Sequence, residues 1–274
     1  KSQLRILLFG NKKKIERLLP KVPIKGLASR LDIINCSSEV KSIDSPIDVI
    51  RNKQGSSLCQ SITTLSKGDA DACVSAGSTG ALLMQSVRLI DTLPGIKRPA
   101  ICASAPTYYG NVSLLDLGAN ISCDANNFHQ FGVLASMKCN LIDGIENPSI
   151  KLLNVGEEAN KGTKELKAAA KLFNEDKNLN YQGFIEGNNL FNDPVDVIVC
   201  DGFTGNVALK TAEGVARLAT GIGADIVKQR FSLRLLSKIF TKSLDDFKNR
   251  LSPTQHNGAI FLGLNRIVVK SHGS

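Results

Sequence analysis

Short apolar runs alternate with longer amphipathic stretches along the whole chain. Apolar runs of strand length cover residues 4–9, 72–75, 100–104, 113–116, 150–155, 195–200 and 267–269. Stretches with a helical period cover residues 13–19, 46–53, 57–66, 80–90, 126–139, 165–174 and 206–228. Continuous apolar runs between amphipathic helices indicate strands that are buried on both faces. The pattern therefore predicts an α/β fold with a parallel sheet and helices on both sides.

Several predicted strands end directly in loops of small residues. These loops are 76–80, 118–120, 156–158 and 201–206. In open α/β sheets, the loops at the carboxyl ends of the strands hold the ligand. Four such loops at one edge would form one continuous site.

The loop Ser75-Ala-Gly-Ser-Thr-Gly80 follows a predicted strand and precedes a predicted helix. Gly77 and Gly80 let the backbone approach an anion, while the helix start and the hydroxyls of Ser75, Ser78 and Thr79 offer donors. This favours a phosphate site. The alternative is an ordinary strand–helix turn with a Ser or Thr cap. The loop matches neither a Walker A sequence nor a dinucleotide-binding glycine motif.

A second loop, Asp201-Gly-Phe-Thr-Gly-Asn206, places a carboxylate, the Thr204 hydroxyl and an amide at a predicted helix start. The Asn206 amide could donate to a carbonyl oxygen that becomes negative during acyl transfer. The alternative is that Asp201 or Asn206 only caps the helix.

Two further loops carry charged and amide groups. Lys161, in the loop that also holds Glu157, is a point charge suited to phosphate, or else a solvated loop charge. Asp116 and Asn120 are candidates to orient a substrate or a metal ion. His272 follows the last predicted strand and could reach the same edge.

Composition narrows the class of partner. The chain has 34 Lys+Arg against 25 Asp+Glu, a net charge of +9, which suits an anionic membrane, an acidic protein, nucleic acid or a phosphorylated substrate. Three Tyr and no Trp argue against a single-stranded nucleic-acid platform. Seven scattered Cys without a C-x-x-C pair indicate free thiols in a reducing cytoplasm. No apolar run approaches the ~20 residues of a membrane span, and no His, Cys or Asp cluster has metal-ligand spacing, so neither metal nor cofactor is expected.

Residues 225–252 predict a protruding, basic, amphipathic helical element. Its basic residues recur every four positions and its apolar residues fall largely on another face: Arg230, Arg234, Lys238 and Lys242 against Leu235, Leu236, Ile239 and Phe240. Such a helix binds a membrane surface or an acidic partner. The alternative is a solvated face over an intramolecular or dimer core.

Six motifs in order resemble the PlsX family of phosphate acyltransferases. They cover residues 73–82, 115–120, 153–162, 199–207, 257–263 and 269–273. The resemblance implies one catalytic domain over residues 1–274: a Rossmann-like three-layer αβα sandwich with a mostly parallel sheet, like the isocitrate and isopropylmalate dehydrogenases and the phosphotransacetylases. The family's opening strand, its Asp-x-Met-Gly-Gly-Asp loop and its terminal helix have no counterpart here. We therefore expect a chain trimmed at both ends, with part of the phosphate site missing.

The resemblance also implies a reaction. A long-chain acyl group passes from acyl-[acyl carrier protein] to inorganic phosphate, giving acyl phosphate for phospholipid synthesis. Phosphate is itself a nucleophile, so the reaction requires a phosphate cradle and an oxyanion donor rather than a serine or cysteine. We expect Lys161 and Asn206 to be catalytic. The expected phosphate and acyl contacts are Ser75, Gly77, Ser78, Thr79, Gly80, Asp116, Asn120, Glu157, Asp201, Thr204 and His272.

The expected partners are an acidic acyl carrier protein, which suits the basic chain, and a second copy in a homodimer. The protein is expected in the cytoplasm, loosely bound to an anionic membrane. Two alternatives remain. One is a phosphotransacetylase-type enzyme that uses acyl-CoA, separated by testing both thioesters. The other is a non-enzymatic peripheral membrane scaffold, which would bind membranes but be inert.

Overall fold

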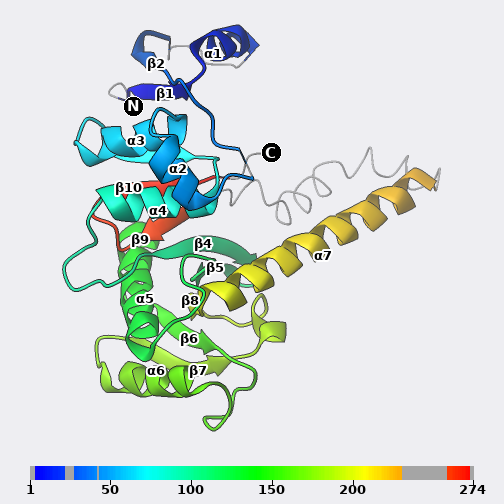
Figure 1. The fold of residues 1–274 in the computed structure, drawn as a ribbon. Coiled ribbons are helices and arrows are strands. Elements are labelled where there is room, and N and C mark those ends of the chain that lie inside the picture. The colour runs from blue at the N-terminus through cyan, green and yellow to red at the C-terminus, as the bar shows by residue number, and fades with distance from the viewer. Residues whose placement is uncertain (1–3, 22–27, 42, 230–257, 272–274) are drawn as a thin grey trace. The chain divides into compact units, whose positions relative to one another are not determined.

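The computed structural model describes residues 4–21, 28–41, 43–229 and 258–271 (Figure 1). The chain divides into two compact units, Lys1–Pro94 with Leu264–Ser274, and Gly95–Gly263. The alternation of strands and helices continues across this division, so the sequence pattern does not mark it.

The first unit is built from short parallel strand pairs and helices. Its elements are β1 (Ile6–Gly10), α1 (Lys12–Leu18), β2 (Leu31–Asn35), α2 (Pro46–Asn52), α3 (Ser57–Ser66), β3 (Ala72–Ser75), α4 (Thr79–Leu89) and β10 (Ile267–Lys270). Strand β1 pairs with β2, and β10 pairs with β3, both in parallel. Serine side chains cap α2, α3 and α4, which explains why the helix starts were readable from the sequence.

The second unit contains a larger sheet. Its elements are β4 (Ala100–Thr107), β5 (Gly110–Leu115), α5 (Ala125–Lys138), β6 (Ser149–Leu153), α6 (Lys164–Glu175), β7 (Asn180–Ile185), β8 (Val197–Val199), α7 (Gly202–Gln229) and β9 (Ala259–Leu262). The strand order is β9-β4-β5-β8-β6-β7. Strands β5, β8, β6 and β7 run parallel to one another, whereas β4 is antiparallel to both neighbours.

The sheet is therefore mixed but mostly parallel, and β4, over the predicted segment 100–104, is the strand that runs antiparallel to its neighbours. Strands β4 and β5 form a hairpin in which Thr107 pairs with Gly110 across Tyr108 and Tyr109. A parallel crossover needs about a dozen residues or more, and this connection is too short for one. Strands β2, β7 and β9 were not predicted, because they are short or interrupted by polar residues and glycine.

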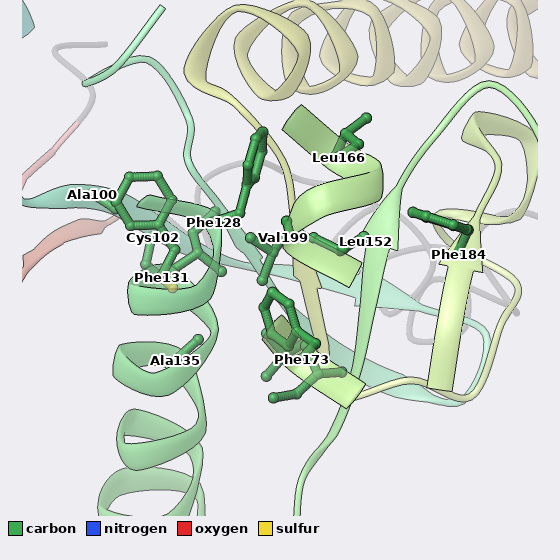
Figure 2. Packing of buried hydrophobic residues seen from close by; sticks show 14 of the residues in the cluster. Ala100, Cys102, Phe128, Phe131, Ala135, Leu152, Leu166, Phe173, Phe184 and Val199 are labelled. Carbon is green, nitrogen blue, oxygen red and sulfur yellow. The ribbon is translucent and has the colours of Figure 1, made fainter. Parts of the chain in front are cut away.

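One face of the second unit's sheet is covered by α5 and α6. Phe128, Phe131 and Phe173 from these helices pack on Leu152 and Val199 of the strands (Figure 2). Val197 and Val199 belong to this cluster, and Ile198 between them is also fully buried. Because neighbouring residues of a strand point to opposite faces, β8 is buried on both faces. This is why its sequence is a continuous apolar run.

Candidate functional site

Three of the predicted site loops lie at one edge of the second unit. Leu115 of β5 and Leu152 of β6 both pair in parallel with Val199 of β8. The loops that leave these three strands therefore begin at the same edge of the sheet. The structure thus brings together the loops that carry Asp116, Asn120, Glu157, Lys161, Asp201, Thr204 and Asn206.

Asp116 is a buried hydrogen-bond acceptor that organises the loop after β5. Its Oδ1 accepts from the backbone N–H groups of Ile101 (2.9 Å), Gly118 (3.2 Å) and Ala119 (3.0 Å). Its Oδ2 accepts from the backbone N (2.6 Å) and the side-chain Nδ2 (2.9 Å) of Asn120. Burial raises the pKa of Asp116, and the hydrogen bonds from Ala119, Ile101 and Asn120 offset part of the rise.

These contacts indicate a positioning role for Asp116 and Asn120. Both side chains are buried, and the amide of Asn120 also donates to the Pro99 carbonyl at 2.8 Å. The oxygens of Asp116 accept five N–H groups from the protein itself. The two residues therefore shape the loop backbone through their own hydrogen bonds.

Two glycines allow the start of α7 to pack closely on this loop. A Cβ on Gly205 would clash with the carbonyl oxygen of Asp116, and a Cβ on Gly202 would lie 2.8 Å from that of Asn120. The N–H of Gly202 donates to the same Asn120 oxygen at 2.7 Å. Side chains at either position would separate the loop from the helix.

The N-terminal cap of α7 is Asp201 and not Asn206. Its Oδ1 accepts from the Thr204 backbone N–H at 2.9 Å, and its Oδ2 accepts from the Thr204 hydroxyl at 2.7 Å. Asn206 lies one turn further on, beside Gly118, whose φ is +125°. Asn206 is exposed, and its amide makes no hydrogen bond within the described part of the chain. The amide is free to donate to a bound group.

Lys161 is presented by a loop that Asn154 braces from inside. Asn154 is buried at the end of β6; its Nδ2 donates to the Lys161 carbonyl at 3.3 Å and its Oδ1 accepts from the Val155 N–H at 2.9 Å. Gly156 leaves room for the lysine, because a Cβ there would lie 3.0 Å from the Lys161 Cγ. Lys161 is exposed, and among the described residues its ammonium has no ion-pair partner.

Asn154 is a site residue that the sequence reasoning missed. Its signal is a polar residue at the end of an apolar strand, directly before a glycine loop. Glu157 was predicted as a substrate contact. In the structure, its carboxylate accepts a hydrogen bond from Asn189 Nδ2 at 3.3 Å.

The Ser75–Gly80 loop lies in the first unit. Ser78 caps α4 by accepting from the Ala81 N–H at 3.5 Å, and Ser75 Oγ accepts from the Gly77 N–H at 3.2 Å. The strand–helix turn with a serine cap is thus present. The helix start and the exposed Gly77 and Gly80 keep the features expected of an anion site.

Two cysteines near the edge of the second unit do not act as thiolates at neutral pH. Burial raises the pKa of Cys200, and burial with the nearby Asp116 and Asp201 raises that of Cys123 to about 12. Only a thiolate is a good nucleophile. Among the described residues at this edge, the Lys161 ammonium and the Asn206 amide are free to stabilise negative charge.

His129 has a structural role. Its Nε2 lies 2.9 Å from Asp176 Oδ2, and its ring packs edge-on against Phe173. His272 and the basic element residues Arg230, Arg234, Leu235, Leu236, Lys238, Ile239, Phe240 and Lys242 lie outside the described residues.

The described ranges contain neither a metal-ligand cluster nor a membrane-spanning helix. No group of three or more His, Cys, Asp or Glu residues there could hold a metal ion. No helix in the same ranges is both long and apolar enough to cross a bilayer.

The fold is shared with known enzymes. The structure is similar to a phosphotransacetylase from Streptococcus pyogenes, with a TM-score of 0.55, 15% identity, and 98% of this chain and 89% of that one covered. It is also similar to 4-hydroxythreonine-4-phosphate dehydrogenase from Klebsiella pneumoniae, with a TM-score of 0.51, 14% identity, and 98% and 80% covered. These likenesses confirm the predicted α/β fold class with a mostly parallel sheet.

Two proteins have a higher sequence identity to this chain than these structures do. A phosphate acyltransferase of Shewanella sediminis is 43% identical over 274 residues, which are 100% of this chain and 80% of that protein. One from Coxiella burnetii is 42% identical over 273 residues, with 99% and 80% covered. The family model described as "Fatty acid synthesis protein" matches residues 1–274. The chain therefore belongs to the fatty acid synthesis protein family, the PlsX family of phosphate acyltransferases.

Proposed function

We propose that this phosphate acyltransferase takes a long-chain fatty acyl group from acyl-[acyl carrier protein] and transfers it to inorganic phosphate. The products are acyl phosphate, used for phospholipid synthesis, and free carrier protein. The observation that carries the proposal is a pair of groups at one sheet edge, the Lys161 ammonium and the Asn206 amide. Neither has a hydrogen-bond or ion-pair partner among the described residues. The absence of a reactive thiolate at Cys123 or Cys200 favours direct attack by phosphate.

The step is a phosphorolysis of a thioester. A phosphate oxygen attacks the carbonyl carbon, a C–O bond forms, and the carbonyl oxygen becomes an oxyanion. Asn206 donates to this oxygen, and Lys161 neutralises charge on phosphate or on the transition state. The C–S bond then breaks, and the carrier's thiolate leaves and takes a proton from solvent.

We assign the phosphate to the loop Ser75, Gly77, Ser78, Thr79 and Gly80. The support is a helix of 11 residues, α4, whose first N–H groups and hydroxyl side chains follow an exposed glycine turn. We further propose that the protein works as a homodimer in the cytoplasm. The basic residues of 230–244 would hold it loosely on an anionic membrane.

The test is phosphate-dependent release of free carrier protein from palmitoyl-carrier protein, with palmitoyl-CoA as the competing donor. Lys161→Ala and Asn206→Ala should each lower turnover by roughly 10²-fold or more, the scale for loss of one positioned donor. Lys177→Ala, at an exposed position outside the site loops, is the control. Folded Lys161 and Asn206 variants with normal turnover would remove both assignments. Turnover with CoA alone would favour the phosphotransacetylase-type reaction instead.

A further inference from the structure

A groove in the second unit begins at the loop that presents Lys161. It runs between α6 and β7 and has a volume of about 770 Å³. Glu157 and Ala159 of the Lys161 loop form one end of it, and Tyr181 and Phe184 of β7 are aromatic residues that line it. Helix α6 and strand β7 lie side by side here (Figure 1). The groove thus shares one loop with the candidate catalytic edge, although Lys161 itself does not line it.

One wall of the groove is a row of lysines on α6. Lys164, Lys167 and Lys171 all line it, at a spacing that keeps them on one face of the helix. Among the described residues none of the three forms an ion pair, and Lys167 Nζ reaches only the Asn160 carbonyl, at 3.4 Å. Glu157 is the one acidic residue that lines the groove, and it already accepts from Asn189. The lysine charges are thus largely uncompensated by the protein.

Two of these lysines lie where a cation does not stabilise the helix. Lys164 is the first residue of α6 and Lys167 lies within its first turn, at the positive end of the helix dipole. Glu165 is the acidic residue of the same turn. Cations at the start of an isolated helix are unfavourable, so the position of Lys164 and Lys167 suits an external negative charge.

Small residues of both elements also line the groove. Ala168 and Ala170 of α6 and Gly183 of β7, whose φ is +90°, line it. Strand β7 is the last strand in the order of this sheet, so its outer edge carries no partner strand within the described residues. A bulky partner can therefore approach the groove from that side.

We propose that the α6–β7 groove docks an acidic helix of the carrier protein that delivers the acyl group. The inference rests on the proposed function and locates the donor-binding surface of the same site. Lys164 and Lys171 are seven residues apart, about 10 Å along the helix axis. A row of that length matches carboxylates on successive turns of a helix better than it matches a single phosphate. Docking here brings the thioester to the loop that carries Lys161.

The test compares two triple variants of equal charge change. In the groove variant, Lys164, Lys167 and Lys171 become Ala; in the control, Lys12→Ala, Lys13→Ala and Lys14→Ala remove three exposed charges from α1. Turnover is measured with palmitoyl-carrier protein and with palmitoyl-CoA, at low and high salt. The groove variant should raise the carrier-protein KM at least 10-fold at low salt, with kcat, the phosphate KM and the CoA reaction within about twofold of wild type. The control variant should behave as wild type.

Several results would overturn the inference. These are an unchanged carrier-protein KM, an equal rise in the control variant, or an equal loss with the CoA donor, which would assign the groove to the acyl chain. A rise in the phosphate KM alone would assign the lysines to phosphate. Wild-type protein that turns over palmitoyl-CoA but not palmitoyl-carrier protein would refute the proposed function and the docking site together. If the wild-type protein is active with the carrier protein and the groove variant has an unchanged carrier-protein KM, the docking site alone is refuted. Titration of carrier protein onto each folded variant gives the same comparison without catalysis.

Discussion

Replacing Asp116 by Asn should destabilise the protein although the two side chains have nearly the same shape. Oδ1 of Asp116 accepts three N–H groups and Oδ2 accepts two. The NH₂ group of an asparagine must take one of these two places, where it would face donors. The orientation with the smaller loss still removes two hydrogen bonds to a carboxylate.

The size of the effect follows from these contacts. A hydrogen bond to a charged group contributes about 1.5–3 kcal/mol, so two of them correspond to roughly 3–6 kcal/mol. Part of this is offset because the neutral amide is cheaper to bury than the carboxylate, whose pKa burial raises. We expect a net loss of about 2–4 kcal/mol in the free energy of unfolding.

Urea unfolding followed by circular dichroism measures this loss, and hydrogen exchange at the Ala119 and Asn120 amides localises it. Asp71→Asn, at an exposed position in the first unit, is the matched control and should change stability by less than about 0.5 kcal/mol. A loss below about 1 kcal/mol for Asp116→Asn, with unchanged exchange at both amides, would refute the acceptor role.

Three further outcomes are expected. Gly77→Ala should raise the phosphate KM more than the acyl-donor KM, because the added Cβ would lie 3.2 Å from Leu58 Cδ1 and shift the loop. An unchanged phosphate KM in the folded variant would place the anion elsewhere. The double change Arg234→Glu, Lys238→Glu should weaken binding to anionic vesicles at low salt and leave turnover in solution unchanged, since each basic residue contributes about 1 kcal/mol at such a surface. Equal binding of the unchanged protein to neutral and anionic vesicles would contradict electrostatic membrane binding. Cys123 has a pKa raised to about 12, so it should react with iodoacetamide at pH 8 roughly 10³-fold more slowly than an ordinary thiol. The rate should rise with pH, because only the thiolate reacts. Rapid labelling at pH 8, measured by mass spectrometry, would contradict the raised pKa.

Local patterns in the sequence determined most of the secondary structure. The predicted bounds 57–66 and 72–75 agree with α3 and β3, because a serine cap and a continuous apolar run are properties of neighbouring residues. The loops after β5, β6 and β8 were predicted for the same reason. Lys161 and Asn206 were singled out because both follow predicted parallel strands and lie in motifs that resemble the family.

Partners distant in the chain required the tertiary structure. The direction of β4 depends on the short connection to β5, and the edge position of β7 depends on the order of all strands in the second unit. The sequence left open whether Asp201 or Asn206 caps α7, since that choice depends on where the helix begins. Asp116 proved to be a structural acceptor because one of its donors, Ile101, comes from another strand. Periodicity and capping act between residues a few positions apart, whereas hydrogen-bond partners and open grooves arise only when remote segments pack together.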